Sequence, residues 1–205
     1  MKTIEKAMLD ADQLQSIAAD ILKEAKIKGA DQAELTVGAN KGFNVTAANG
    51  DVEYVEYNQG KSIYVRVFFG KRSGTAGLSD IRPEAIRAAV EAACHIAKFT
   101  DEDPVSGLAD KEDLSFDYPN VELARSWDIS VEKAIELACQ CEREALDYDK
   151  RIMRVEAASV ATLEAIHLYA NSLGFMGCYP YTRHDINCVV VAKDGDGMQR
   201  DYSYT

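Results

Sequence analysis

KDGDGMQRDYSYT, residues 193–205, ends the sequence with a Gly-rich turn and one strand of a β-hairpin. Asp-Gly pairs favour the tight turns between hairpin strands, because both residue types tolerate the backbone angles that such turns require. Beyond the turn, alternate positions share one side of the predicted strand, and they hold Met198, Arg200, Tyr202 and Tyr204. A strand here needs neighbours, and the preceding sequence supplies them as part of an internal repeat.

The first copy of this repeat begins with an amphipathic helix. Its apolar residues recur at helical spacing before a natural stop at Gly29, and they are Leu14, Ile17, Ala18, Ile21, Leu22 and Ala25. Alternating apolar residues then predict strands at 33–39, 43–47, 51–57 and 62–69. Asn49–Gly50 predicts a two-residue hairpin turn, KRSGTAG at 71–77 predicts another turn, and Pro83 opens a second helix.

The second copy follows the same order. A helix begins behind Ser130, a favourable N-cap, and strands are predicted at 152–161, 164–170 and 185–192 before the DGDG turn. Equivalent landmarks lie 122 or 123 residues apart, and they pair Asn49 with Asn171, Ile63 with Ile186, and Gly74 with Gly197. We interpret this spacing as the duplication of a helix–sheet–helix unit.

The repeat predicts an α+β fold of duplicated helix–antiparallel sheet–helix units, of which the second lacks its closing helix. The expected division is a first lobe at 1–99, an acidic linker at 100–127 and a truncated second lobe at 128–205. The closing helix of the first copy starts at Pro83, and the offset of 123 residues places its counterpart just after Thr205. We therefore expect a fragment, the N-terminal domain of a longer protein.

The linker at 100–127 carries eight Asp or Glu residues against one Lys and one Arg. An irregular stretch of this length is unusual inside a compact domain and predicts a segment that runs over the surface. Its apolar side chains are the expected anchors to the body, and they are Leu114, Phe116 and Trp127. A solvated loop and a contact segment for a partner are both open interpretations.

The composition is typical of a globular protein without a nucleic-acid surface. The 205 residues carry a net charge of −11 and a pI near 4.8, whereas nucleic-acid binding requires clustered Lys and Arg to neutralise phosphates. Charges interrupt the opening MKTIEKAML, so it does not resemble a signal peptide, and no apolar run reaches the roughly 18 residues of a membrane span. Five cysteines, an odd number within apolar stretches, favour reduced thiols in a cytoplasmic protein.

The sequence offers few candidates for catalysis. Its three histidines are His95, His167 and His184. None has the H-E-x-x-H spacing of catalytic zinc sites. Cys139 and Cys141 point to different sides of a helix, which disfavours a shared metal. Only His184, in the sequence TRHD, has charged neighbours on both sides, and it is therefore a candidate functional residue.

A glycine-rich segment precedes that histidine. NSLGFMGCYPY, residues 171–181, combines two glycines, a proline and three aromatic residues. Glycines in a strand permit the close approach of another backbone, either a neighbouring strand or an extended peptide ligand. The DGDG turn lacks the downstream ligands of a calcium loop, so it indicates a hairpin turn and no metal site.

Four segments resemble the TldD/PmbA family, and within it the PmbA branch, also called TldE and once described as a modulator of DNA gyrase. They are TAGLSDIRPEAIRAAVEAAC at 75–94, DEDPVSGLAD at 101–110, WDISVEKAIELA at 127–138, and the whole of residues 171–205. The resemblance runs from about residue 10 to the end of the sequence, and the last 35 residues are its most specific part. Family members are about twice as long, in agreement with the expected truncation.

The resemblance implies a bacterial, cytoplasmic heterodimer of TldD-like and PmbA-like subunits that acts as a zinc metalloprotease on unfolded or extended peptides. The zinc-binding H-E-x-x-x-H of the family lies in the TldD-like subunit and has no match here, so no catalytic residue or metal ligand is carried over. Zinc is therefore expected in the partner, and this chain is expected to be a silent subunit that shapes the substrate chamber.

Four residues of the family-specific segment are candidates for the substrate path or a partner contact, and they are Arg183, His184, Arg200 and Tyr202. Two other functions stay open. The first is a non-enzymatic binding module that regulates toxin–antitoxin or gyrase-linked proteins. The second is a self-sufficient hydrolase with ligands beyond Thr205. No membrane or nucleic-acid partner is expected.

Overall fold

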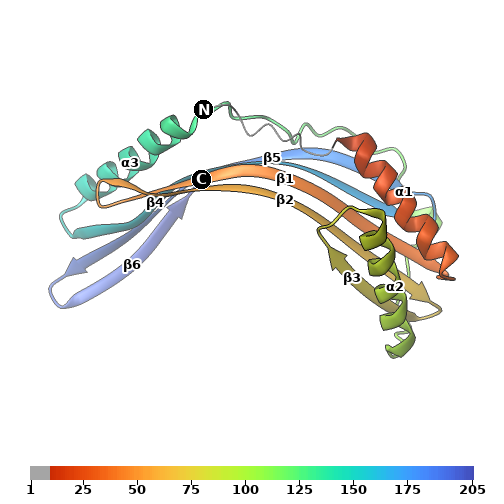
Figure 1. Cartoon of the computed structure of the whole chain (residues 1–205). Helices are drawn as coiled ribbons and strands as arrows, with labels where there is room; N and C mark the ends of the chain where they lie inside the picture. Colours follow the sequence, from red (N-terminus) through yellow and green to blue (C-terminus); the bar gives the residue numbers. More distant parts are fainter. Residues whose placement is uncertain (1–9) are drawn as a thin grey trace. The chain divides into compact units, whose positions relative to one another are not determined.

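The computed structural model describes residues 10–205, so the prediction about a signal peptide at 1–9 lies outside the described residues. The helices in this range are α1 (Ala11–Ile27), α2 (Pro83–Phe99) and α3 (Val131–Tyr148), with a short 3-10 turn at Lys111–Asp113. The strands are β1 (Gln32–Ala48), β2 (Asp51–Phe69), β3 (Arg72–Leu78), β4 (Ile152–Asn171), β5 (Met176–Asp194) and β6 (Gly197–Tyr204). They form one sheet in the order β3-β2-β1-β4-β5-β6 (Figure 1).

This order confirms the predicted α+β fold and the duplication. Each copy is a helix followed by three consecutive strands that pair in sequence order, and the first strands of the two copies, β1 and β4, are neighbours. The hairpins β2–β3 and β5–β6 are antiparallel and turn at Gly70 and Gly195, both with φ of 58°. The first strands of these hairpins, β2 and β5, are each 19 residues long. The two copies therefore share turn geometry as well as element order.

The chain divides into two compact units. Unit 1 comprises the residues up to Asn40, Gly60–Leu123 and Ala165–Tyr181, and unit 2 comprises Lys41–Gln59, Ala124–Glu164 and Thr182–Thr205. The four long strands contribute residues to both units. The division at 1–99, 100–127 and 128–205 follows the repeat along the sequence and stays a prediction.

Unit 1 has a core between two helices and one face of its strands. α1 begins at Asp10, whose side chain accepts a hydrogen bond from the Gln13 backbone in a capping box, and Gly29 follows it with φ of 83°. α2 begins at Pro83, as predicted. The apolar stripes of both helices pack on alternate strand residues, among them Leu35, Val37, Ile63, Val65 and Leu168. Full burial of such side chains contributes roughly 1.5–3 kcal/mol each.

The strand predictions were wrong in several boundaries. Residues 71–77 form most of β3 instead of a turn, and the turn is at Gly70–Lys71. Gly74 faces α2 so closely that a β-carbon would collide with the backbone of Ala93 and Ala97. The glycines of this segment therefore serve close helix–strand packing. β1, β2 and β4 are also continuous where two shorter strands each were predicted, and the strand predicted at 185–192 extends over Met176–Asp194 as β5.

Unit 2 has a separate core beneath α3. The Ser130 side chain caps this helix by accepting a hydrogen bond from the Lys133 backbone, as predicted. Small residues of α3 then pack on strand residues of the same unit, and the buried members of this cluster are Val45, Ala47, Ala134, Ala138 and Val160. A β-carbon at Gly42 would collide with the Thr162 carbonyl, so this glycine permits the close approach of β1 and β4.

A buried carboxylate joins α3 to the first hairpin. Glu142 is 2% exposed, and its oxygens lie 3.2 and 3.0 Å from the Gly50 amide nitrogen, which donates to them. Asn49 and Gly50 have φ of 58° and 82°, which confirms the predicted type I′ turn. The side chain of Glu142 therefore holds the turn against the helix.

The linker contacts both units through separate ends. In unit 1 the Lys71 ammonium donates to the Ser106 carbonyl at 3.0 Å, and the Leu108 amide donates to the Gln32 side chain at 3.0 Å. In unit 2 Trp127 packs against the core under α3. The predicted anchors Phe116 and Trp127 are confirmed, while Leu114 is half-buried.

Replacement of Gly74 by Val tests the close packing of α2 on β3. The added side chain would enter the α2 backbone, so we expect the free energy of unfolding to fall by about 3 kcal/mol, at the upper end for overpacked cores. Thr75→Val is the matched control, because Thr75 is exposed on the same strand. Urea denaturation measures both variants, and equal unfolding midpoints would contradict the packing described here.

Candidate functional site

His184 is held by the end of the linker. Its Nε2 lies 2.8 Å from the Arg125 carbonyl oxygen, and its ring meets Trp127 edge-on at 5.8 Å between centroids. Because a carbonyl only accepts, Nε2 carries the proton in this contact, and Nδ1 is buried with no hydrogen-bond partner among the described residues. Thr182 adds two hydrogen bonds to the Arg125 backbone. In this structure, His184 joins the linker to β5.

The other three candidates lie apart from this contact. Arg183 is exposed and 3.6 Å from Asp185. Arg200 donates from its Nε to Glu156, and this hydrogen bond is the main cause of the lowered pKa of Glu156. Tyr202 is 63% exposed and stacks on Tyr204 at 6.2 Å between ring centroids.

The structure does not gather the four candidates at one point. Arg183 and His184 are consecutive on β5 and so point to opposite faces of the sheet. Arg200 pairs with Val191, seven residues along β5 from His184, or about 23 Å at 3.3 Å per residue. Arg200 and Tyr202 share one side of β6. A role for any of the four in a substrate path or partner contact stays a proposal.

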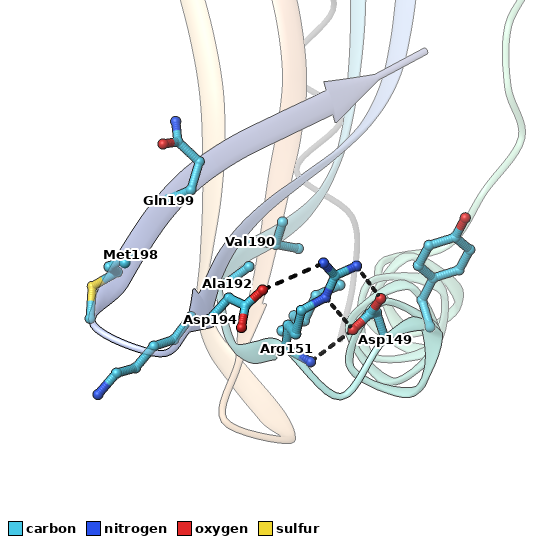
Figure 2. Close-up of a pocket in the computed structure, with 11 residues that line it drawn as sticks. Asp149, Arg151, Val190, Ala192, Asp194, Met198 and Gln199 are labelled. Carbon is cyan, nitrogen blue, oxygen red and sulfur yellow. Dashed lines mark hydrogen bonds and ion pairs between the residues drawn. The ribbon is translucent and has the colours of Figure 1, made fainter.

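An open hollow of about 550 Å³ lies at the end of α3 in unit 2. Val190 and Ala192 form an apolar wall, and Met198 and Gln199 of the β5–β6 hairpin also line the hollow (Figure 2). The Arg151 guanidinium donates to the carboxylate of Asp149 at 2.7 Å and thereby lowers the pKa of that group to about 2. The two carboxylates here, Asp149 and Asp194, are both paired with Arg151, so they are poorly suited to general acid–base work.

The thiols of Cys141 on α3 and Cys188 on β5 are adjacent. Burial raises the pKa of Cys188 to about 11, and the adjacent Cys141 contributes to this shift. A thiol with so high a pKa stays protonated near neutrality and is a weak nucleophile. Sequence reasoning compared Cys141 with Cys139 instead, because the pairing of α3 with β5 is a tertiary contact.

Unit 1 leaves one face of its strands without a helix, and aromatic side chains gather there. The rings of His167 and Tyr179 lie 5.6 Å apart, and those of Tyr179 and Tyr181 lie 6.1 Å apart. We call His167, Tyr179 and Tyr181 the aromatic row. Sequence reasoning gave His167 no functional role, but it left an extended peptide ligand open for residues 171–181, which include Tyr179 and Tyr181.

The described residues do not fit the zinc that the resemblance implies for the family. Among residues 10–205, no three His, Cys, Asp or Glu side chains are close enough to hold a metal ion together. The three histidines occupy separate positions, on α2, β4 and β5. None of the described helices is long and apolar enough to cross a membrane.

Two family models match the chain. Residues 33–97 match domain 1 of the PmbA/TldA metallopeptidases, and residues 124–205 match their central domain. The matched ranges fall on either side of most of the acidic linker.

Curated relatives support the same assignment. The chain is 37% identical over 205 residues to "Metalloprotease PmbA" of Escherichia coli O157:H7, covering 100% of this chain and 45% of the relative. It is 38% identical over 182 residues to "Metalloprotease PmbA homolog" of Haemophilus influenzae, covering 89% of this chain and 40% of the relative. The chain thus spans less than half the length of these relatives.

Solved structures share the fold at low sequence identity. A crystal structure from Bacteroides thetaiotaomicron, named as a proposed modulator of DNA gyrase, has a TM-score of 0.82 at 18% identity. The match covers 96% of this chain and 45% of the chain in that structure. The structure of TldE from Thermococcus kodakarensis has a TM-score of 0.71 at 18% identity, and the match covers 92% of this chain and 42% of the TldE chain. The two family models and the relatives at 37% and 38% identity show that the chain belongs to the PmbA/TldA metallopeptidase family.

Proposed function

We propose that this chain is the N-terminal part of a PmbA/TldE-like subunit in a heterodimeric zinc metalloprotease that processes or degrades unfolded peptides. The observation that carries this proposal is the 37% identity, across the whole chain, to a protein named Metalloprotease PmbA. In the proposal the complex works in the bacterial cytoplasm. Its second subunit is TldD-like and holds the zinc.

The role of this chain in the complex is to bind and orient peptide and to shape the chamber around the partner's site. Bound zinc would supply Lewis-acid chemistry and an activated water. The described residues would contribute contacts that place the peptide, and two surfaces suit this role. The helix-free face of unit 1 carries the aromatic row, and β6 is an edge strand with free backbone groups.

β6 also carries side chains suited to contact with a peptide or a partner. Met198, Tyr202 and Tyr204 are each more than 60% exposed, on the side of the strand that also bears Arg200. Tyrosine and arginine are enriched in protein interfaces, because each combines a large contact area with hydrogen-bonding groups. This arrangement supports the proposal that Arg200 and Tyr202 lie on the substrate path or at the partner contact.

Zinc content and hydrolysis together test the division of labour. We expect the natural full-length protein, purified alone, to bind no stoichiometric zinc and to cleave no unfolded peptide. Hydrolysis is expected only after a TldD-like chain is added. About one zinc per chain, with hydrolysis by the protein alone, would contradict the proposal and favour a self-sufficient hydrolase.

Alanine variants test the candidate residues in the complete complex. We expect Arg183→Ala and Tyr202→Ala to lower peptide hydrolysis about fivefold, as for contacts near 1 kcal/mol, without a change in thermal stability. His184→Ala is expected to lower stability by about 1–2 kcal/mol, because it frees the linker end at Arg125. Tyr54→Ala, exposed in the same unit, is the control. Unchanged hydrolysis in Arg183→Ala and Tyr202→Ala would remove both from the site.

The alternative function is a non-enzymatic binding module that regulates toxin–antitoxin or gyrase-linked proteins. The name of the Bacteroides thetaiotaomicron structure favours it, although at 18% identity that likeness concerns the fold. This alternative requires binding to gyrase or to a toxin without any TldD-like subunit. Pull-down of purified gyrase by the full-length protein separates it from the metalloprotease proposal.

A further inference from the structure

Two glycines lie beside the aromatic row on the helix-free face of unit 1, and we call the region around them the Gly38 notch. Gly38 is on β1, where a β-carbon would be 3.2 Å from the Ser62 hydroxyl and 3.9 Å from His167 Nδ1. Gly60 is on β2, where a β-carbon would be 3.3 Å from the side chain of Asn40. Because the glycines have no side chains, those of Ser62 and Asn40 can lie close to the backbone of the sheet.

Polar groups around this notch are free to bind a ligand. The side chains of Asn40, Ser62 and His167 are half-buried, and none makes a side-chain hydrogen bond to another described residue. Half-buried polar groups usually find partners, in the protein, in water or in a ligand. Together they offer an amide, a hydroxyl and an imidazole, which match the donors and acceptors of a peptide backbone.

The charged groups near the row are already paired with each other. The nearby charged side chains of this face, Glu34 and Arg66, lie 3.7 Å apart as an ion pair, and Tyr169 donates a hydrogen bond to Glu34 at 2.9 Å. Tyr179 is 44% exposed, so one side of the row is open to another ring. Aromatic rings attract each other at centroid distances of roughly 4.5–7 Å, the spacing already present within the row.

The chain itself shows what kind of segment this face accepts. Phe116 and Tyr118 of the irregular linker lie 5.8 and 6.1 Å from the ring of Phe175, on the same face as the row. Gly177 makes room for them, since a β-carbon there would be 3.0 Å from the Phe175 ring and 3.6 Å from that of Tyr118. A non-helical segment with aromatic residues at alternate positions thus already occupies one end of this face.

We propose that the aromatic row and the Gly38 notch form a binding site for a non-helical peptide segment that carries aromatic side chains. The inference rests on the proposed function, which it deepens by assigning a class of substrate to this surface. The peptide backbone lies over the two glycines and bonds to Asn40, Ser62 and His167. An aromatic side chain of the peptide packs on Tyr179 and Tyr181.

Binding of a defined probe tests the site without any hydrolysis. The probe is a fluorescent peptide with the sequence of residues 113–121, DLSFDYPNV, and its control has serine in place of both aromatic residues. Fluorescence anisotropy with the natural full-length protein, without a TldD-like chain, measures both. We expect the aromatic probe to bind and the serine control to bind about tenfold more weakly or not at all.

Variants of the protein assign the binding to the row. Tyr179→Leu removes the ring but keeps an apolar side chain, and we expect it to weaken binding of the probe about fivefold to tenfold. Gly38→Val would displace the Ser62 side chain from the notch and is expected to weaken binding as well. Tyr64→Ala is the matched control, because Tyr64 is an exposed tyrosine on the same face of β2 and outside the row. Thermal denaturation shows whether each variant is folded.

Several outcomes would overturn the inference. Equal binding of the aromatic and serine peptides would remove the aromatic specificity. Equal loss in Tyr179→Leu and Tyr64→Ala, or no loss in folded Tyr179→Leu and Gly38→Val, would remove the row as the site. If the probe binds only after Phe116 and Tyr118 of the protein are replaced, the probe occupies the place of these two residues at Phe175 and not the row.

These results are separable from the test of the metalloprotease proposal. Binding that depends on Tyr179, together with zinc and hydrolysis in the isolated chain, would keep the site and refute the silent subunit. Partner-dependent hydrolysis without binding at the row would keep the silent subunit and refute the site.

Discussion

The alternation of side chains along the long strands is the constraint on which the rest of the structure depends. Because successive residues point to opposite faces, a strand that buries Leu35 and Val37 under the helices must present Glu34 and Gly38 on the other face. The helices cover one face in unit 1, so the other is left for contacts of its own. The aromatic row, the notch and the linker segment at Phe116 all lie on that second face.

The sequence was most informative where local chemistry decides the structure. Helix starts at Pro83 and Ser130, the stop at Gly29 and the turn at Asn49–Gly50 depend on neighbouring residues, and all were predicted. Strand lengths were harder, because tertiary packing overrides the local signal of glycine. Gly42 interrupts the apolar pattern of β1 and suggests a break, yet it continues the strand where the Thr162 carbonyl approaches.

The candidate sites show the same limit. Arg183, His184, Arg200 and Tyr202 were chosen from one family-specific stretch of sequence, and the sheet register distributes them over two strands and both faces. The aromatic row instead joins β4 to β5, and its notch adds Gly38 from β1 and Gly60 from β2. No single stretch of sequence contains this set. It becomes visible once the strand order places β1 between β2 and β4.

The duplication preserved the backbone and changed the surfaces. The hairpin glycines Gly70 and Gly195 have the same φ, so residues of β3 correspond to residues of β6 at an offset of 125 positions. The predicted pairing of Gly74 with Gly197 was therefore wrong by two residues. The helix-facing residues of β3 are Gly74, Ala76 and Leu78, which are small or apolar and accept α2. Their counterparts in β6 are Gln199, Asp201 and Ser203, all polar.

A helix packed on β6 as closely as α2 packs on β3 would bury these polar groups, which is costly unless each finds a hydrogen-bond partner. The apolar side chains of β6 are on its opposite side, at Met198, Tyr202 and Tyr204. The second copy therefore reuses the fold of the first with an edge suited to a different contact.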